Sequence, residues 1–101
     1  MLFEWDDHKA KTNKQKHQVS FDLAAQVFDD PRQLCVFDRT VEEEDRYITL
    51  GLVKRTILFV CHCYRENQHG EKIIRIISAR KATPKEKAAY VASAFGRAGR
   101  A

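Results

Sequence analysis

The sequence has no long hydrophobic run and few of the residues that usually divide a chain into separate segments. The longest uninterrupted apolar stretch, residues 57–61, has five residues, whereas a transmembrane helix needs about 20. Only four glycines and two prolines occur among the 101 residues, and no internal repeat or low-complexity segment is evident. The N-terminus lacks a basic segment that leads into an apolar stretch. These absences argue against a membrane span and predict one cytoplasmic domain.

Cysteine is also scarce. The three cysteines, Cys35, Cys61 and Cys63, are an odd number, which predicts reduced thiols in a chain without an export signal. Cys61-His62-Cys63 invites a zinc interpretation, but zinc sites usually have a second pair of ligands, and Cys35 is the only other thiol. In a strand, the two thiols would share one face and His62 would point to the other. We therefore expect no metal ion and no cofactor, and interpret the thiols as core residues.

Charge is distributed unevenly along the chain. Residues 1–45 contain six Lys and Arg against eleven Asp and Glu, a net charge of −5. Residues 46–101 contain twelve against three, a net charge of +9, so the whole chain carries +4. A positive C-terminal half indicates a polyanionic partner or an acidic protein partner. A solvated surface without a special role is an equally good interpretation of the charge alone.

The N-terminal third predicts a short strand and two helices. The strand lies at residues 3–5, and Asp6 is a suitable N-cap for a helix that ends near Gln18. Ala10 is the only apolar residue within that helix, so we expect it to pack through one narrow edge. Ser20 can cap the second helix. Its apolar residues are spaced to share one face: Phe21, Ala24, Ala25 and Phe28.

The rest of the chain predicts a sheet and a final helix. Four strand-like segments lie at residues 33–38, 46–53, 56–65 and 72–79, and their short connections predict an antiparallel meander. Thr83-Pro84-Lys85-Glu86 is a capping box that predicts a helix to about Phe95, with Ala88, Val91 and Phe95 facing the sheet. We expect an α+β fold with an antiparallel four- to five-stranded sheet, two N-terminal helices and one C-terminal helix. This single domain would cover residues 1–95, with a flexible basic tail at residues 96–101.

The first predicted helix has a cationic face. Lys9, Asn13, Lys16 and His17 are spaced so that they share this face. Lysines can contact phosphates, asparagine can contact a base or sugar, and histidine can exchange a proton near neutral pH. A metal-independent ribonuclease needs a base for the 2′-hydroxyl, cations for the phosphorus centre and an acid for the leaving oxygen. Alternatively, Asn13 and His17 only attach this apolar-poor helix to the sheet.

The predicted sheet contributes a second group of basic residues: Arg46, Arg65, Arg75 and Arg80. Strict alternation along the last strand would place Arg75 and Arg80 on opposite faces. Guanidinium groups suit bidentate phosphate binding, and several on an uncovered face would form a shallow floor for RNA. The alternative is that they form structural ion pairs, for example with Asp38 or Glu86.

Two stretches resemble the signatures of the BrnT family of toxins, a branch of the RelE-like ribonucleases. They are Phe3-Glu4-Trp5-Asp6 and Ile73-Ile74-Arg75-Ile76-Ile77-Ser78-Ala79-Arg80-Lys81-Ala82. Shorter matches follow the family's order between about residues 3 and 90, among them Lys16-His17, Val19-Ser20-Phe21, Val27-Phe28-Asp29-Asp30, Arg46-Tyr47-Ile48, Gly51-Leu52 and Tyr90. Cys61-His62-Cys63 and the polar turn at residues 66–72 depart from the family pattern.

The resemblance implies a RelE-like fold and a cytoplasmic toxin that cleaves RNA and inhibits translation. It also implies neutralisation by a BrnA-type antitoxin, in a heterotetramer of two toxins and two antitoxins that represses its own operon. The antitoxin, and not this chain, would contact operator DNA. The other function that we consider is a catalytically inactive module that binds RNA or the antitoxin and acts in operon autoregulation.

The resemblance does not by itself assign catalytic roles. We expect His17 to act as general acid or base, and Arg65 and Arg80 to bind the scissile phosphate. The flanking RNA would be held by Lys9, Lys16, Arg46, Arg75 and Lys81. Within the second signature we expect the chemistry at Arg80 and a more structural role for Arg75.

Overall fold

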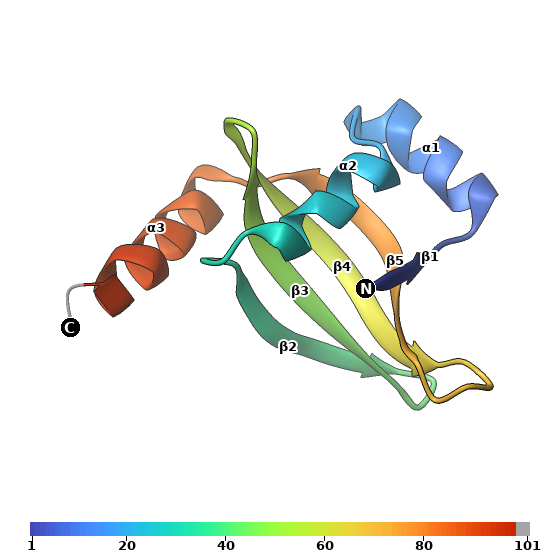
Figure 1. Ribbon diagram of the computed structural model, residues 1–101. Coiled ribbons are helices and arrows are strands. Elements are labelled where there is room, and N and C mark those ends of the chain that lie inside the picture. Colours follow the sequence, from blue (N-terminus) through green and yellow to red (C-terminus); the bar gives the residue numbers. More distant parts are fainter. Residues whose placement is uncertain (99–101) are drawn as a thin grey trace.

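The computed structural model describes residues 1–98, with side chains as far as residue 94, as a curved five-stranded sheet with three helices (Figure 1). The strands are β1 (Leu2–Glu4), β2 (Leu34–Val41), β3 (Glu44–Val53), β4 (Thr56–Glu66) and β5 (Lys72–Lys81), in the order β1-β5-β4-β3-β2. The meander from β2 to β5 is antiparallel, as predicted. β1 pairs with β5 in parallel, so the sheet is mixed, and the α+β fold class is confirmed.

The first hairpin is tighter than the sequence indicates. Only Glu42 and Glu43 connect β2 to β3, at φ angles of 49° and 66°. These left-handed conformations are uncommon for residues other than glycine, and no glycine marks the turn. The prediction that the strands end at residue 38 and resume at residue 46 is therefore wrong. The turn at Lys54 and Arg55 is confirmed.

Both N-terminal helices begin at the predicted caps. The Asp6 side chain accepts a hydrogen bond from the backbone of Lys9 at the start of α1 (Asp7–His17). Ser20 caps α2 (Phe21–Ala25), which continues into the 3₁₀ helix η1 (Gln26–Asp29). Figure 1 shows α1 and α2 on the same side of the sheet, and α3 (Pro84–Ala98) apart from them on the other flank of the sheet.

The main core lies between the sheet and the helices α1 and α2. It consists of ten buried residues: Val19, Phe21, Ala24, Val27, Val53, Leu58, Val60, Ile74, Ile76 and Ala79. Gly51 permits the closest approach of β3 to η1, because a Cβ atom there would lie 2.7 Å from the Cβ of Val27. A smaller cluster of Leu50, Ala82 and Tyr90 lies on the opposite face, beneath α3.

The last helix packs through a different face from the one predicted. Tyr90 and Ala94 are buried, whereas Ala88 and Val91 are exposed. The Tyr90 hydroxyl donates a hydrogen bond to Asp30, which fixes this rotation of the helix. The predicted contact of Phe95 involves a side chain outside the described residues. α3 extends to Ala98 and so overlaps the predicted tail, of which residues 99–101 are likewise outside the described part.

A single polar side chain attaches α1 to the sheet. Asn13 is the only buried residue of this helix, as expected from its lack of apolar residues. Its Nδ2 donates to the backbone carbonyls of Ala79, at 2.8 Å, and Val19, at 3.0 Å. Its Oδ1 accepts from the backbone N–H of Ala79 at 3.1 Å. β1 pairs only with residues 73–75 of β5, so Asn13 takes the place of a neighbouring strand at Ala79.

Replacing Asn13 with alanine should lower the free energy of unfolding by about 3 kcal/mol, because buried backbone groups of Ala79 and Val19 lose their partners. Urea unfolding measures this change. Thr12→Ala, at an exposed position of the same helix, serves as the control and should change stability by less than about 0.5 kcal/mol. Equal effects of the two substitutions would contradict the role of Asn13.

Candidate functional site

A β-bulge in β5 decides which side chains share a face of the sheet. Ile76 pairs with His62 and Ser78 pairs with Cys61, so Ile77 is left over. On either side of this irregularity, Arg75 pairs with Cys63 and Arg80 pairs with Phe59, which are four positions apart on β4. The two arginines therefore lie on the same face. The prediction that they lie on opposite faces is wrong, because alternation is interrupted where a residue bulges out.

The face that carries these arginines is opposite to α1 and α2, and α3 covers only its Leu50–Phe59 end. We call it the arginine face; its basic residues include Arg46, Arg65, Arg75 and Arg80, and Arg39 on β2, which pairs with Arg46, lies on the same face. Its floor between the arginines includes the buried thiols of Cys61 and Cys63. Burial and the neighbouring carboxylate of Glu44 raise the pKa of Cys63 to about 11, and the positive charges of Arg75 and Arg46 act in the opposite direction. The thiols are thus protonated, inert floor residues beneath longer cationic side chains.

His62 points away from the two cysteines, as alternation predicts. Its Nε2 forms a hydrogen bond with the hydroxyl of Thr49 at 2.8 Å, and its ring packs at right angles to Phe28. The ring is fully buried, and burial lowers its pKa to about 4. The Cys-His-Cys sequence therefore does not converge, and no group of three or more potential metal ligands occurs within residues 1–98.

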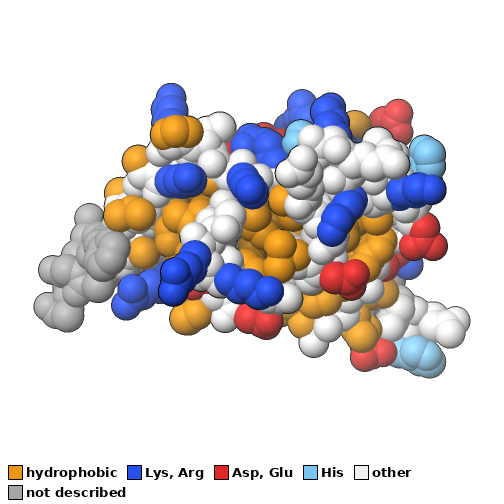
Figure 2. Space-filling view, turned by 90° about the horizontal axis from the view of Figure 1, so that it is seen from above, with side chains coloured by type: hydrophobic (Ala, Val, Ile, Leu, Met, Phe, Trp, Pro, Cys, Tyr) orange, Lys and Arg blue, Asp and Glu red, His pale blue; other side chains and the backbone are white. Residues whose placement is uncertain are grey.

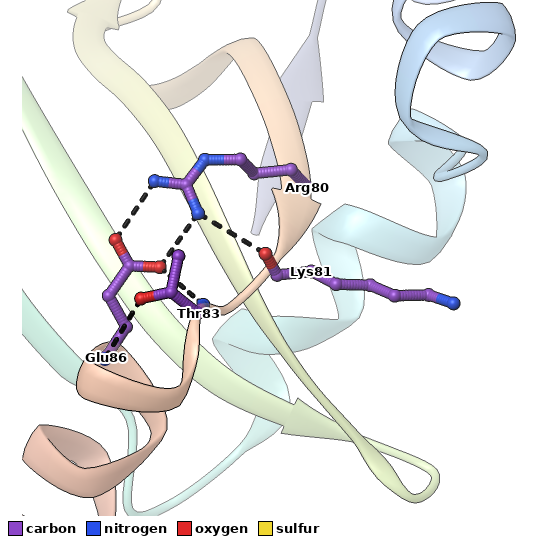
Figure 3. Close-up of polar contacts among 4 residues, drawn as sticks. All are labelled: Arg80, Lys81, Thr83 and Glu86. Atoms are coloured by element: carbon purple, nitrogen blue, oxygen red, sulfur yellow. Dashed lines mark hydrogen bonds and ion pairs between the residues drawn. The ribbon is translucent and has the colours of Figure 1, made fainter.

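Arg80 is held by the first turn of α3 (Figure 3). Its Nη1 and Nη2 donate to the two carboxylate oxygens of Glu86 at 2.8 and 2.9 Å. Glu86 also accepts from the backbone of Thr83, and these hydrogen bonds, led by that from Arg80, lower its pKa to about 2. The guanidinium carbon lies 3.9 Å from the ring centroid of Phe59. Among the described residues nothing accepts from Nε of Arg80, so the edge of the guanidinium formed by Nε and Nη2 still has donors to offer.

Arg65 and Arg75 share one carboxylate, that of Glu4 on β1. Nε of Arg65 donates to its Oε1, and Nη1 of Arg75 donates to its Oε2 at 2.8 Å. The hydrogen bond from Arg65 is the main cause of the lowered pKa of Glu4. The ion pair of Arg80 with Glu86, considered from the sequence as the alternative to phosphate binding, is present. Asp38 was the other acid considered as a partner. Its Oδ2 lies 3.5 Å from Nε of Arg39, with which it forms an ion pair.

The cationic face of α1 borders a shallow groove of about 310 Å³ along the outer edge of β5. Its lining residues are His8, Lys9, Thr12, Asn13, Lys16, His17, Ile77 and Ser78. Lys9, Lys16 and His17 are therefore together, as their spacing predicts, while Asn13 has the structural role described above. Ser78 lines this groove and also lies between Arg75 and Arg80 in β5, so it joins the groove to the arginine face.

The predicted site residues do not all meet at one point. Arg65 is six positions from Phe59, the partner of Arg80, which separates the two backbones by roughly 20 Å along β4. Arg65 and Arg80 therefore cannot contact the same phosphate. Lys81 lines a separate depression with Arg55 and Lys87. Arg46 is half-buried on β3 beside the floor, with Nε 3.4 Å from Glu44.

Two contributors to this region, Ser78 and Glu4, were not predicted. Both lie inside the two signature stretches, but no spacing rule links Ser78 to His17 or Glu4 to the arginines. Their roles depend on the bulge and on the parallel pairing of β1, which are long-range features.

Figure 2 shows Lys and Arg side chains spread over one side of the molecule around patches of hydrophobic surface. None of the described helices has the length and apolar character that crossing a membrane requires.

Fold and site together define a small α+β protein with a basic, partly uncovered sheet face, a class suited to binding a polyanion. The sequence matches the family of the ribonuclease toxin BrnT of type II toxin–antitoxin systems over residues 5–86. Because the match covers most of the chain, the protein belongs to this family, and the resemblance drawn from the sequence is confirmed. Ribonuclease activity and an antitoxin partner are the family's general properties. No individual curated protein shows significant similarity to the chain.

The buried imidazole of His62 predicts a pH dependence of stability. Its pKa of about 4 in the fold lies below the ordinary value of 6.5, so protons bind preferentially to the unfolded chain. The contribution of the neutral His62 imidazole to the free energy of unfolding is fully present above pH 6.5 and is lost as the pH falls towards 4. Between pH 7.5 and pH 5.0 the loss should be about 2 kcal/mol, measured as the free energy of urea unfolding.

The control for this prediction compares two glutamine substitutions. His62→Gln removes the buried titrating group, so its stability should change with pH by about 2 kcal/mol less than that of the wild type. His69→Gln, at an exposed position, should follow the wild-type curve. The acidic groups contribute equally to the pH dependence of stability in all three proteins. If the curves of unfolding free energy against pH are parallel for the two variants, His62 does not cause the loss of stability at low pH.

Proposed function

We propose that the protein is a metal-independent endoribonuclease toxin that cleaves RNA and thereby inhibits translation. The observation that carries this proposal is the position of Ser78, with Arg75 and Arg80 on either side of it on one face, and the groove of Lys9, Lys16 and His17 beside it. This arrangement brings cationic donors and a titratable group to one edge of the sheet. The family's ribonuclease activity supports the same conclusion.

The phosphodiester that is cut would lie over Ser78. Arg75 and Arg80 are three and two residues from it in β5, roughly 7–10 Å along the strand, which is within the reach of an arginine side chain. Each is held by a carboxylate through part of its guanidinium and keeps further N–H donors. Arg80 would stabilise the charge that develops on the oxygens of the scissile phosphate, and Arg75, on the other side of Ser78, would contact the adjacent phosphate.

His17 would supply the proton transfer. In RNA cleavage without a metal ion, a base removes the 2′-hydroxyl proton, the 2′-oxygen attacks phosphorus, and an acid protonates the leaving 5′-oxygen. His17 lies in the same groove as Ser78 and can take one of these roles. Lys9 and Lys16 would bind adjacent phosphates there. Arg46, Arg65 and Lys81 lie farther away and would hold the flanking RNA, which revises the expectation that Arg65 binds the scissile phosphate.

The antitoxin would be of the BrnA type and would form a complex of two toxins and two antitoxins in the cytoplasm. The antitoxin would supply the contacts with operator DNA. The net charge of +9 in residues 46–101 favours an acidic antitoxin surface on the arginine face, where it would exclude RNA.

His17→Ala and Arg80→Ala should each slow RNA cleavage about 100-fold or more, because each removes a contact made in the transition state. Single-turnover cleavage of a labelled RNA in EDTA measures the rate. Lys11→Ala is the matched control: it removes one positive charge from α1 at a position that does not line the groove, and it should change the rate less than about threefold.

Two results would count against the proposal in different ways. Wild-type rates in both His17→Ala and Arg80→Ala would refute the site assignment while leaving ribonuclease activity in place. Binding of RNA by the wild type without cleavage, with and without EDTA, would favour the alternative function of an inactive RNA- or antitoxin-binding module.

A further inference from the structure

Glu4 occupies an unusual position for an acidic residue in a protein with a basic face. β1 has only three residues, and its parallel pairing with β5 sets Glu4 beside Arg75. The carboxylate reaches two guanidinium groups from two different strands, Nε of Arg65 on β4 and Nη1 of Arg75 on β5. A simple structural ion pair needs one partner, whereas Glu4 gathers two like charges that would otherwise repel each other.

The two arginines are neighbours on the arginine face. Arg65 pairs with Ile73, and Arg75 pairs with Cys63, so the arginines are diagonal partners, a relation that places their backbones about 7–8 Å apart. Their side chains remain 53% and 34% exposed. Both Nη groups of Arg65 and the Nε and Nη2 groups of Arg75 have no acceptor among the described residues. Two guanidiniums thus present spare donors to solvent from fixed positions.

We propose that Glu4 is a positioning residue that holds Arg65 and Arg75 side by side as a clamp for one phosphate of bound RNA. This inference rests on the proposed RNA cleavage and assigns the clamp to a phosphate that flanks the scissile one. The shared carboxylate of Glu4 fixes the orientation of both guanidiniums, so fewer side-chain conformations are lost when the phosphate binds. The first signature stretch then contributes to substrate binding as well as to the start of the fold.

The direction in which Glu4→Gln changes the affinity for RNA distinguishes a positioning role from long-range electrostatics. Glu4→Gln removes a negative charge, which by long-range electrostatics alone should tighten RNA binding. If Glu4 positions the clamp, the same substitution weakens binding instead. Glu66→Gln is the matched control, because Glu66 is an exposed neighbour of Arg65 on β4, and its replacement gives the same change in net charge.

The test measures the Kd of a single-stranded 2′-O-methyl RNA, which lacks the attacking hydroxyl, at several salt concentrations. Glu4→Gln should raise Kd about five- to tenfold and reduce the slope of log Kd against log salt by about 0.7, the contribution of one phosphate contact on a single strand. Glu66→Gln should lower Kd slightly and leave the slope unchanged. In an Arg65→Ala, Arg75→Ala background, Glu4→Gln should no longer weaken binding and should only lower Kd slightly, as Glu66→Gln does. A purely structural role would lower the unfolding temperature without changing the slope.

A second measurement uses inorganic phosphate and the NMR signals of the arginine Nε–H groups. The Arg75 signal should shift with phosphate in the wild type and in Glu66→Gln, and should need several-fold more phosphate in Glu4→Gln. If Glu4→Gln does not fold, Arg65→Lys replaces it, because lysine keeps the charge but loses the Nε donor that holds the shared carboxylate. Arg65→Lys should weaken phosphate binding to a similar extent.

The two measurements distinguish the possible failures. If phosphate binding depends on Glu4 but the wild type neither binds nor cuts RNA, the proposed function is wrong, and only the positioning of Arg65 and Arg75 by Glu4 for a phosphate stands. If the wild type cuts RNA but Glu4→Gln matches Glu66→Gln in both measurements, the positioning role is wrong and the proposed function stands.

Discussion

One unpaired residue in β5, Ile77, determines how the basic side chains of this protein are arranged. It shifts the register against β4, so Arg75 and Arg80 point to the same face although five positions separate them. Two residues later, Ala79 exposes backbone groups on the outer edge of the strand, where Asn13 binds them and fixes α1. The bulge and this attachment together place the groove of α1 beside Ser78. Without the bulge, alternation would place Arg75 and Arg80 on opposite faces of the sheet, so only one of them could lie beside Ser78 on its face.

Ion pairing explains why the uneven charge of the sequence gives a well-ordered basic face. Glu4, from the acidic half of the chain, neutralises and aligns Arg65 and Arg75 from the basic half. Glu86, one of the few acids of the basic half, does the same for Arg80. Because these pairs are partly exposed, solvent screens them and their contribution to stability is modest. Their larger effect is on orientation, since they hold flexible side chains in place while leaving donors for a ligand.

Local signals in the sequence predicted most of the fold. The caps at Asp6 and Ser20, the capping box at Thr83 and Glu86, and the antiparallel meander depend on neighbouring residues, and all are confirmed. The two-residue turn at Glu42 and Glu43, the bulge, the parallel pairing of β1 and the rotation of α3 were missed. Each of these is set by contacts between distant segments, which periodicity and propensity do not record. The candidate site was predicted in its residue types, but its grouping needed the register of β4 and β5.

The central claim is that Arg75 and Arg80 act on the same stretch of RNA backbone from one face. The most direct measurement is a double-mutant cycle of Arg75→Ala and Arg80→Ala, with the single-turnover rate of RNA cleavage as the readout. Shared action predicts that the double variant loses less than the two single variants combined, with a coupling of about 1 kcal/mol or more. Losses that add within about 0.5 kcal/mol would show that the two arginines act independently and would contradict the account.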